Sequence, residues 1–380
     1  MNSPAGILIT AIALLAVLIA RRWVAALAAR SDVAARLRTL YTLLAALLAL
    51  RLLAPLLASA PLAVALMTVA AWLPIAALRL VEELCRRHAP RPVKMVALGG
   101  ALGFTAMALT IGLVWSAGAI RALAAFQSGM LVTTVWLLAR SRDGLAPAER
   151  RTADTFLVAL LLAIPLALTD FTYLFPELPV RGGPFAVLIL LLATSRLTAE
   201  QGTVPRLAAD LGTVAAASGA AVAVGYLASP ALGGSVGAIL AGGVAAIAAL
   251  LLLVERFAAL RSRQSGLITA LAATPADDTD AIISAHPLLE TGRMLGDAEL
   301  SQYPPESVAR LFDHPVISAE THDQDARDAG RDLLDATGAT HLLRVSRNPP
   351  RLLAVTAGGL SDRSLDDELA VASRLIERTA

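Results

Sequence analysis

Nine apolar stretches fill the first 255 residues of the chain, and arginines gather in every second gap between them. A helix needs about 20 mostly apolar residues to cross a bilayer. The stretches therefore predict an all-α polytopic membrane bundle of about nine transmembrane helices. The seventh is the weakest, because only Pro184–Ser195 is continuously apolar, and it could instead be re-entrant. The expected spans are roughly 5–22, 40–58, 62–80, 95–115, 120–139, 154–173, 182–197, 208–229 and 235–255.

The arginines also predict the orientation of the bundle. Arg21 and Arg22 follow the first span instead of preceding it, so this span does not resemble a cleaved signal peptide. Arg256, Arg261 and Arg263 follow the last span. Because cytoplasmic loops attract arginine and lysine, we expect the N-terminus outside the cell and the C-terminus in the cytoplasm.

Composition divides the chain into two parts of opposite charge. The whole sequence is 57% hydrophobic with a mean hydropathy of +0.67 and a net charge of +2. Residues 1–263 carry a net charge of +11, and residues 264–380 carry −9. The first part is typical of a membrane domain with basic loops, and the second of an acidic soluble tail. Because an acidic surface repels nucleic acid, no nucleic-acid partner is expected.

Few ionisable side chains lie at membrane depth, where a charge is costly to bury and is a functional candidate by default. Arg51 lies inside the second span and Asp170 near the outer end of the sixth, and the outer level also holds Arg121, Tyr173 and Arg181. One interpretation is an outward-facing ligand pocket in which Arg51 pairs with Asp170. The alternative is that Arg51 extends to the interface while Asp170 caps a helix.

Several chemistries lack the residues they require. Ion-driven carriers usually need acidic side chains near the membrane midplane, and the spans offer none there. No H-E-x-x-H, G-x-S-x-G or phosphate-loop motif is present. Cys85 is the sole cysteine, which leaves no disulfide framework and no cysteine metal site. The sequence therefore predicts no catalytic residue, no cofactor and no metal.

A heptad pattern follows the last span. Its apolar positions are interrupted by one polar residue, and the spacing is 4, 3, 4, 3, 4 through Leu253, Phe257, Leu260, Gln264, Leu267 and Leu271. This spacing predicts a juxtamembrane linker helix over 256–275 whose seam pairs two copies in a parallel homodimer. The alternative is an ordinary amphipathic helix leaving the membrane.

The remaining residues, 276–380, predict an independently folding cytoplasmic α+β domain, after a transmembrane domain over 1–255. Thr279–His286 and Pro305–Phe312 look helical, and Thr321 with Gln324 predicts a capping box for the next helix, which Gly338 ends. Two strands, Thr340–Ser346 and Arg351–Ala357, precede a final helix. His286 and His314 both precede proline, which predicts helix ends followed by extended segments, although a metal-binding pair is the alternative.

The segment Leu333–Arg378, which includes LLDATGATHLLRVSRNPPRLLAVTAGG, resembles the closing hairpin and final helix of a GAF domain, truncated to two clear strands. Together with the spans, it resembles the front half of bacterial multi-spanning sensor histidine kinases. The resemblance implies a multi-pass protein of the bacterial inner membrane with a cytoplasmic signalling partner. No kinase motif follows. We therefore expect a non-enzymatic sensory or regulatory protein. The alternative is a transporter-like or membrane-assembly scaffold protein with a regulatory tail.

Overall fold

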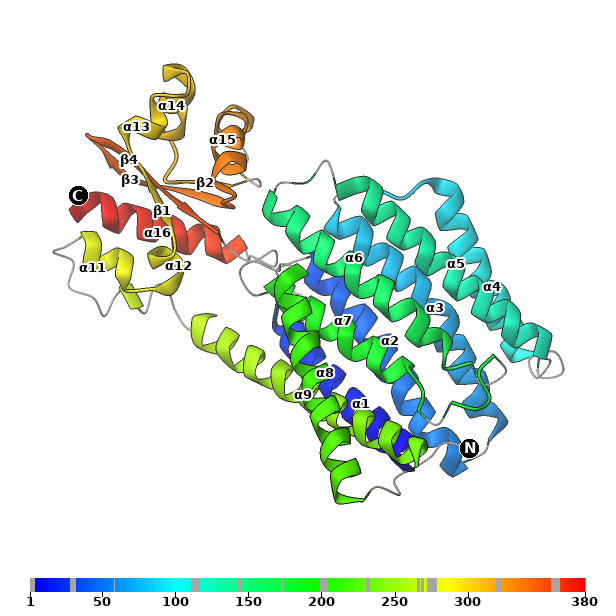
Figure 1. The fold of residues 1–380 in the computed structure, drawn as a ribbon. Helices are drawn as coiled ribbons and strands as arrows, with labels where there is room; N and C mark the ends of the chain where they lie inside the picture. Colours follow the sequence, from blue (N-terminus) through cyan, green and yellow to red (C-terminus); the bar gives the residue numbers. More distant parts are fainter. Residues whose placement is uncertain are drawn as a thin grey trace. The chain divides into compact units, whose positions relative to one another are not determined.

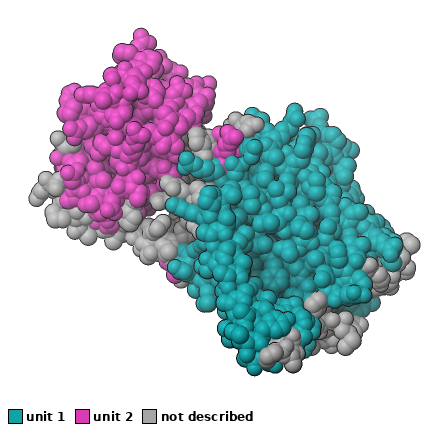
Figure 2. Space-filling view, viewed as in Figure 1, with its two compact units in different colours: residues 1–144, 151–196, 202–257 teal, residues 145–150, 197–201, 258–380 magenta. Residues whose placement is uncertain are grey.

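The structure, a computed structural model, divides into two compact units (Figure 2). The membrane unit comprises residues 1–144, 151–196 and 202–257, and the tail unit comprises 145–150, 197–201 and 258–380. The residues described are 4–27, 32–57, 59–85, 87–110, 117–142, 145, 147–171, 174–178, 180–198, 204–229, 233–264, 267, 270–271, 279–318, 321, 323–356 and 363–379.

The membrane unit is a bundle of helices (Figure 1). Eight of those described are long and apolar enough to cross a membrane, which confirms a multi-pass membrane protein, although the exact count of nine is not established. The helices are α1 (Pro4–Leu27), α2 (Asp32–Leu57), α3 (Ala60–Leu84), α4 (Arg91–Leu109), α5 (Ala117–Ser141), α6 (Pro147–Leu168), α7 (Gly183–Thr198), α8 (Val204–Ala228) and α9 (Gly234–Gln264).

Helix α7 is the exception to the expected spans. Its 16 residues extend about 24 Å along the helix axis, less than the roughly 30 Å of a hydrocarbon core. From Gly182 to Ser195 every residue is buried except Phe185 and Ile189, which are partly buried. A helix that is apolar on all sides and enclosed by protein need not match the lipid thickness. The weak seventh span is thus a short inner helix of the unit.

A proline in α3 explains one polar contact inside the bundle. Pro74 has no N–H, so the carbonyl of Ala70 loses the donor that a regular helix provides four residues later. The side chain of Gln127, from α5, donates its Nε2–H to this carbonyl. In lipid such a freed carbonyl needs a partner from a neighbouring helix. The contact therefore ties α3 to α5 at the proline.

The tail unit is built on a four-stranded antiparallel sheet in the order β1-β4-β3-β2. The two strands predicted from the sequence are its centre, β3 (His341–Arg347) and β4 (Pro350–Val355). The edge strands β1 (Arg293–Leu295) and β2 (Val316–Ser318) were not predicted, because three residues are too few for an alternating pattern to be recognised. The sheet is therefore fuller than the sequence indicated.

Helices cover both faces of the sheet (Figure 1). Leu343, Val345, Leu353 and Val355 point into the core beneath α16, whereas Leu342, Leu352 and Ala354 point into the core beneath α15. This alternation is the period-two pattern of a strand buried on both sides. The helices are α11 (Thr279–Ser284), α12 (Pro287–Glu290), α13 (Asp297–Leu300), α14 (Pro305–Leu311), α15 (Gln324–Thr337) and α16 (Arg363–Thr379).

The start of α15 corrects one prediction, while its end confirms another. Asp323, not Thr321, is the N-cap, and its carboxylate accepts from the N–H groups of Asp325 (3.0 Å) and Ala326 (3.4 Å). Thr321 instead accepts the N–H of Ser318 through its hydroxyl at 2.8 Å. The helix ends as predicted at Gly338, whose φ of +66° is the left-handed conformation that glycine adopts without strain.

The juxtamembrane segment belongs to the two units, not to a separate linker. Leu253 and Phe257 are buried, and the Phe257 ring lies 5.2 Å from that of Trp23. Leu267 and Leu271 are buried in the tail core together with residues of β3, β4 and α16. The dimer prediction assumed that this seam is exposed in a single chain, and for these four residues that assumption is wrong. The side chains of Leu260 and Gln264 lie outside the described residues.

Candidate functional site

The ion pair between Arg51 and Asp170 is the most informative feature of the membrane unit. Arg51 lies in α2, and Asp170 follows the end of α6. The guanidinium Nη1 donates to carboxylate Oδ2, and the two side chains are only 18% and 27% exposed. The pairing suggested by the sequence is present. It fixes α2 against the end of α6 at a depth where an unpaired charge would be costly.

Asp170 also caps α7. Its second oxygen, Oδ1, accepts the N–H of Gly183 at 3.0 Å, and the hydroxyl of Thr169 accepts the N–H of Gly182 at 2.6 Å. A carboxylate at a helix N-terminus is stabilised by free N–H groups and by the helix dipole. A Cβ at Gly183 would overlap the Asp170 carboxylate, so glycine is required for this approach. The sequence offered two alternatives for Asp170, an ion pair with Arg51 or a helix cap, and the structure shows both.

Arg181 completes the group. Its Nη1 donates to the carbonyl of Thr169 at 3.1 Å and to that of Phe175. We call Arg51, Thr169, Asp170, Arg181, Gly182 and Gly183 the N-end cluster. Arg121 is exposed on α5 and, within the part of the chain that is described, has no hydrogen bond or ion pair to this cluster. Tyr173 lies outside the described residues.

A second polar cluster lies at the other end of α7 and was not predicted. The hydroxyls of Tyr41 in α2 and Thr194 in α7 form a hydrogen bond inside the core. Arg256 of α9 pairs with Asp210 of α8, with side chains 15% and 9% exposed, and approaches Ser195 Oγ at 3.5 Å. We call these five residues the C-end cluster. Asp210 and Arg256 are far apart in the sequence, so no spacing rule links them.

The tail unit carries two buried polar contacts between its sheet and α16. His341 of β3 is buried, and its Nε2 lies 2.9 Å from Oδ1 of Asp366, whose other oxygen accepts from Ser318 Oγ at 3.4 Å. Arg344 donates to Glu377 at 2.8 Å. A nucleophilic serine would donate its hydroxyl hydrogen bond to a general base such as His341. Ser318 instead donates to the carboxylate of Asp366. These contacts hold α16 on the sheet.

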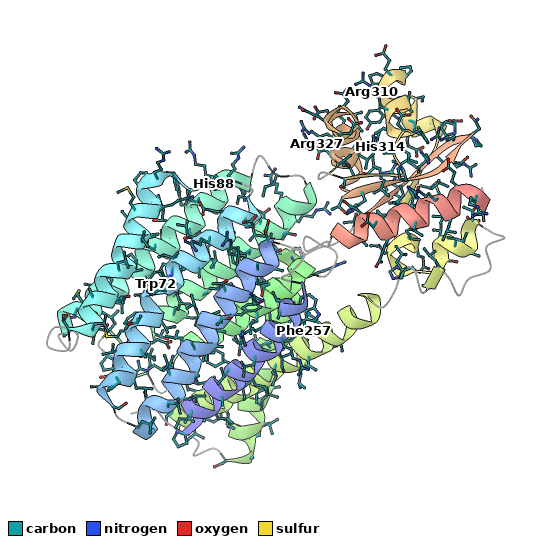
Figure 3. The ribbon with its side chains drawn as sticks, turned by 180° about the vertical axis from the view of Figure 1, so that it is seen from behind. Trp72, His88, Phe257, Arg310, His314 and Arg327 are labelled. Carbon is teal, nitrogen blue, oxygen red and sulfur yellow. The ribbon has the colours of Figure 1, made fainter. Side chains whose placement is uncertain are left out.

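The two histidines that precede proline have separate roles. His286 is buried, and its Nδ1 accepts the N–H of Leu288 at the start of α12, so an extended segment does not follow it as predicted. His314 lies just before β2 (Figure 3). Its Nε2 lies 3.0 Å from Asp323 Oδ2. The described residues contain no group of three or more His, Cys, Asp or Glu side chains placed to hold a metal ion.

Neither a family model, nor a curated protein, nor a solved structure matches this chain. The resemblance of the tail to a GAF domain therefore stays a prediction.

Proposed function

We propose that this membrane protein is sensory or regulatory, and that α7 and α9 relay a change at the outer face to the tail. The observation that carries the proposal is the double role of α9. Its last membrane turns hold Arg256 and Phe257, which contact Asp210 and Trp23. The segment that follows it supplies Leu267 and Leu271 to the tail core. A shift of α9 would therefore act directly on tail packing, because close-packed cores transmit strain.

The outer end of the relay is the N-end cluster. Asp170 is shared between Arg51 and the N-terminus of α7, so a ligand or lipid that competes for Arg51 would loosen the cap of α7. At its other end α7 contacts Tyr41 and Arg256 through Thr194 and Ser195. One short, enclosed helix thus joins both clusters. The proposal retains Arg51, Asp170 and Arg181 as ligand-responsive residues and an orientation with the tail in the cytoplasm.

The GAF-like interpretation of the tail is part of this proposal, and so is a cytoplasmic signalling partner. The observation that supports this interpretation is a sheet with helices packed on both faces, α16 on one and α15 on the other. Transport is the weaker alternative. In the described spans, the ion pairs of both clusters lie at the ends of α7, and the midplane positions that proton- or ion-driven carriers use hold no acidic residue.

The test is hydrogen exchange of the full-length protein in lipid nanodiscs, read by mass spectrometry. Asp170→Asn removes the charge that Arg51 pairs with, and we expect faster exchange in β3 and α16 of the tail. The matched control is Asp154→Asn in α6, which removes the 3.1 Å ion pair with Arg142, the residue that follows α5, and leaves the Asp170 cap of α7 in place. Unchanged exchange in the tail of the Asp170→Asn variant would leave the tail uncoupled and refute the relay.

A further inference from the structure

The length of two helices fixes the depth of the loop between them. From Gly183 to Arg196, the basic residue that marks the cytoplasmic end of α7, the helix extends only about 20 Å. From Arg151 to Leu168, α6 extends about 26 Å. A hydrocarbon core is about 30 Å thick. The outer ends of α6 and α7, joined through the N-end cluster, therefore stop short of the outer boundary of the hydrocarbon.

Several polar groups at this break are bonded within the protein. The N–H groups of Gly182 and Gly183 have side-chain acceptors, and two carbonyls, of Thr169 and Phe175, accept from Arg181. The N–H groups of Leu174 and Phe175 bond to the carbonyl of Phe171. A loop in water needs no such pairing, whereas non-helical backbone at membrane depth requires it.

The side chains of the loop are unusual for a surface in water. Leu174, Phe175 and Leu178 are 41%, 41% and 39% exposed, and they follow α6, which also exposes Leu161 and Leu162. Such a run continues the lipid-facing surface of the helix. Glu177 is exposed between them, and a carboxylate near the outer boundary reaches the headgroup layer at modest cost.

We infer that residues 174–178 are embedded in the outer leaflet, where Leu174, Phe175 and Leu178 contact phospholipid acyl chains while Arg181 and Asp170 satisfy the break behind them. The embedded loop gives the N-end cluster a direct contact with lipid. This inference does not depend on the relay to the tail.

Single cysteines in a Cys85→Ala background test the loop in full-length protein in liposomes. Phe175→Cys and Leu178→Cys would be labelled with bimane, with Ser229→Cys, at the end of α8, as the matched exposed control. Quenching would be compared between phosphatidylcholine carrying a nitroxide high on its acyl chain and aqueous iodide. We expect the lipid nitroxide to quench positions 175 and 178 several-fold more than iodide does, and the reverse at position 229.

Iodide quenching at 175 and 178 as strong as at 229 would place the loop in water and overturn the inference. Weak quenching by both reagents would mean that another protein surface covers the loop, which would also overturn it. Leu174→Cys supplies a third position if either variant fails to fold. The nitroxide lipid is present in both leaflets, so it would quench an embedded loop even if the protein had the opposite orientation.

Discussion

At the scale of single residues, the Gln127 side chain replaces a helical hydrogen bond that Pro74 cannot make. Removing the Gln127 amide leaves the Ala70 carbonyl without a donor, because Pro74 cannot provide one. Gln127→Leu should therefore destabilise the protein by about 1 kcal/mol. In a Pro74→Ala background the helix provides its own N–H, and the same change should cost much less. Denaturant unfolding in detergent would measure both.

The control for this cycle is Ser128→Ala, because Ser128 bonds within its own helix to Ala124 at 2.7 Å. This change should cost little in either background. An equal loss from Gln127→Leu with and without Pro74 would show that the glutamine packs sterically and does not complete the broken helix.

Two neighbouring glycines of α4, Gly99 and Gly100, differ in how closely α5 approaches them. A Cβ on Gly100 would overlap the ring of Phe126 from α5, whereas one on Gly99 has nothing within 4 Å. Gly100→Ala should therefore destabilise the α4–α5 contact, by about 1–3 kcal/mol, as overpacking does. Gly99→Ala is the matched control and should be neutral or slightly stabilising. Similar effects from both neighbours, measured as thermal unfolding in detergent, would contradict this assignment.

At the scale of elements, the N-terminus of α15 links the tail to pH. The hydrogen bond to His314, followed by that from the N–H of Ala326, holds the pKa of Asp323 below its ordinary value. A lowered pKa in the folded state stabilises the fold above the ordinary value and loses that contribution as pH falls. We therefore expect tail stability to decline below about pH 4.

The measurement is chemical unfolding of the tail unit as a function of pH. Asp323→Asn keeps a capping acceptor but cannot titrate, so it should flatten the acid decline. His314→Gln should weaken the lowering of the Asp323 pKa and also reduce the decline. Asp335→Asn removes one charge from the same helix and controls for net charge. An acid decline that Asp323→Asn leaves intact would assign the effect to other groups.

How far the sequence predicts each element depends on how long its pattern runs. Spans of 19 or more residues, the paired strands β3 and β4 and the end of α15 at Gly338 follow from patterns of several residues. Strands of three residues cannot establish a period. Asp323 was missed as a cap because Thr321 with Gln324 offers the same signature. Of the N-end cluster, the charged residues were predicted, while the role of Gly182 and Gly183 depends on a tertiary approach that no local pattern encodes.

At the scale of the whole molecule, the arginine distribution orients all the spans together. The basic residues that follow the first and the last span predict an extracytoplasmic N-terminus and a cytoplasmic tail. Alkaline phosphatase fused after Ala380 should be inactive, and a cytoplasmic fluorescent reporter at the same site should be bright. The same fusions at Ser229, after α8, should behave in the opposite way. Phosphatase activity at Ala380 would reject this topology.

The segment that follows α9 is part of the folded tail, so the stable tail domain begins before residue 276. Leu267 and Leu271 are 3% and 6% exposed in a core shared with β3, β4 and α16. Loss of a buried leucine side chain costs about 2–5 kcal/mol, and a whole domain is stable by only about 5–15 kcal/mol. A fragment of residues 258–380 should therefore unfold cooperatively, while residues 276–380, first expected to fold alone, should be far less stable.

Denaturant unfolding of the two fragments measures this difference, and point variants show its cause. In the longer fragment, the Leu267→Ala and Leu271→Ala pair should reproduce most of the loss. Val371→Ala, at a position 41% exposed on α16, is the matched apolar control and should cost little. Equal stability of the two fragments would mean that the segment after α9 is merely a tether, because a core that tolerates the loss of both leucines cannot respond to movement of the helix that precedes them.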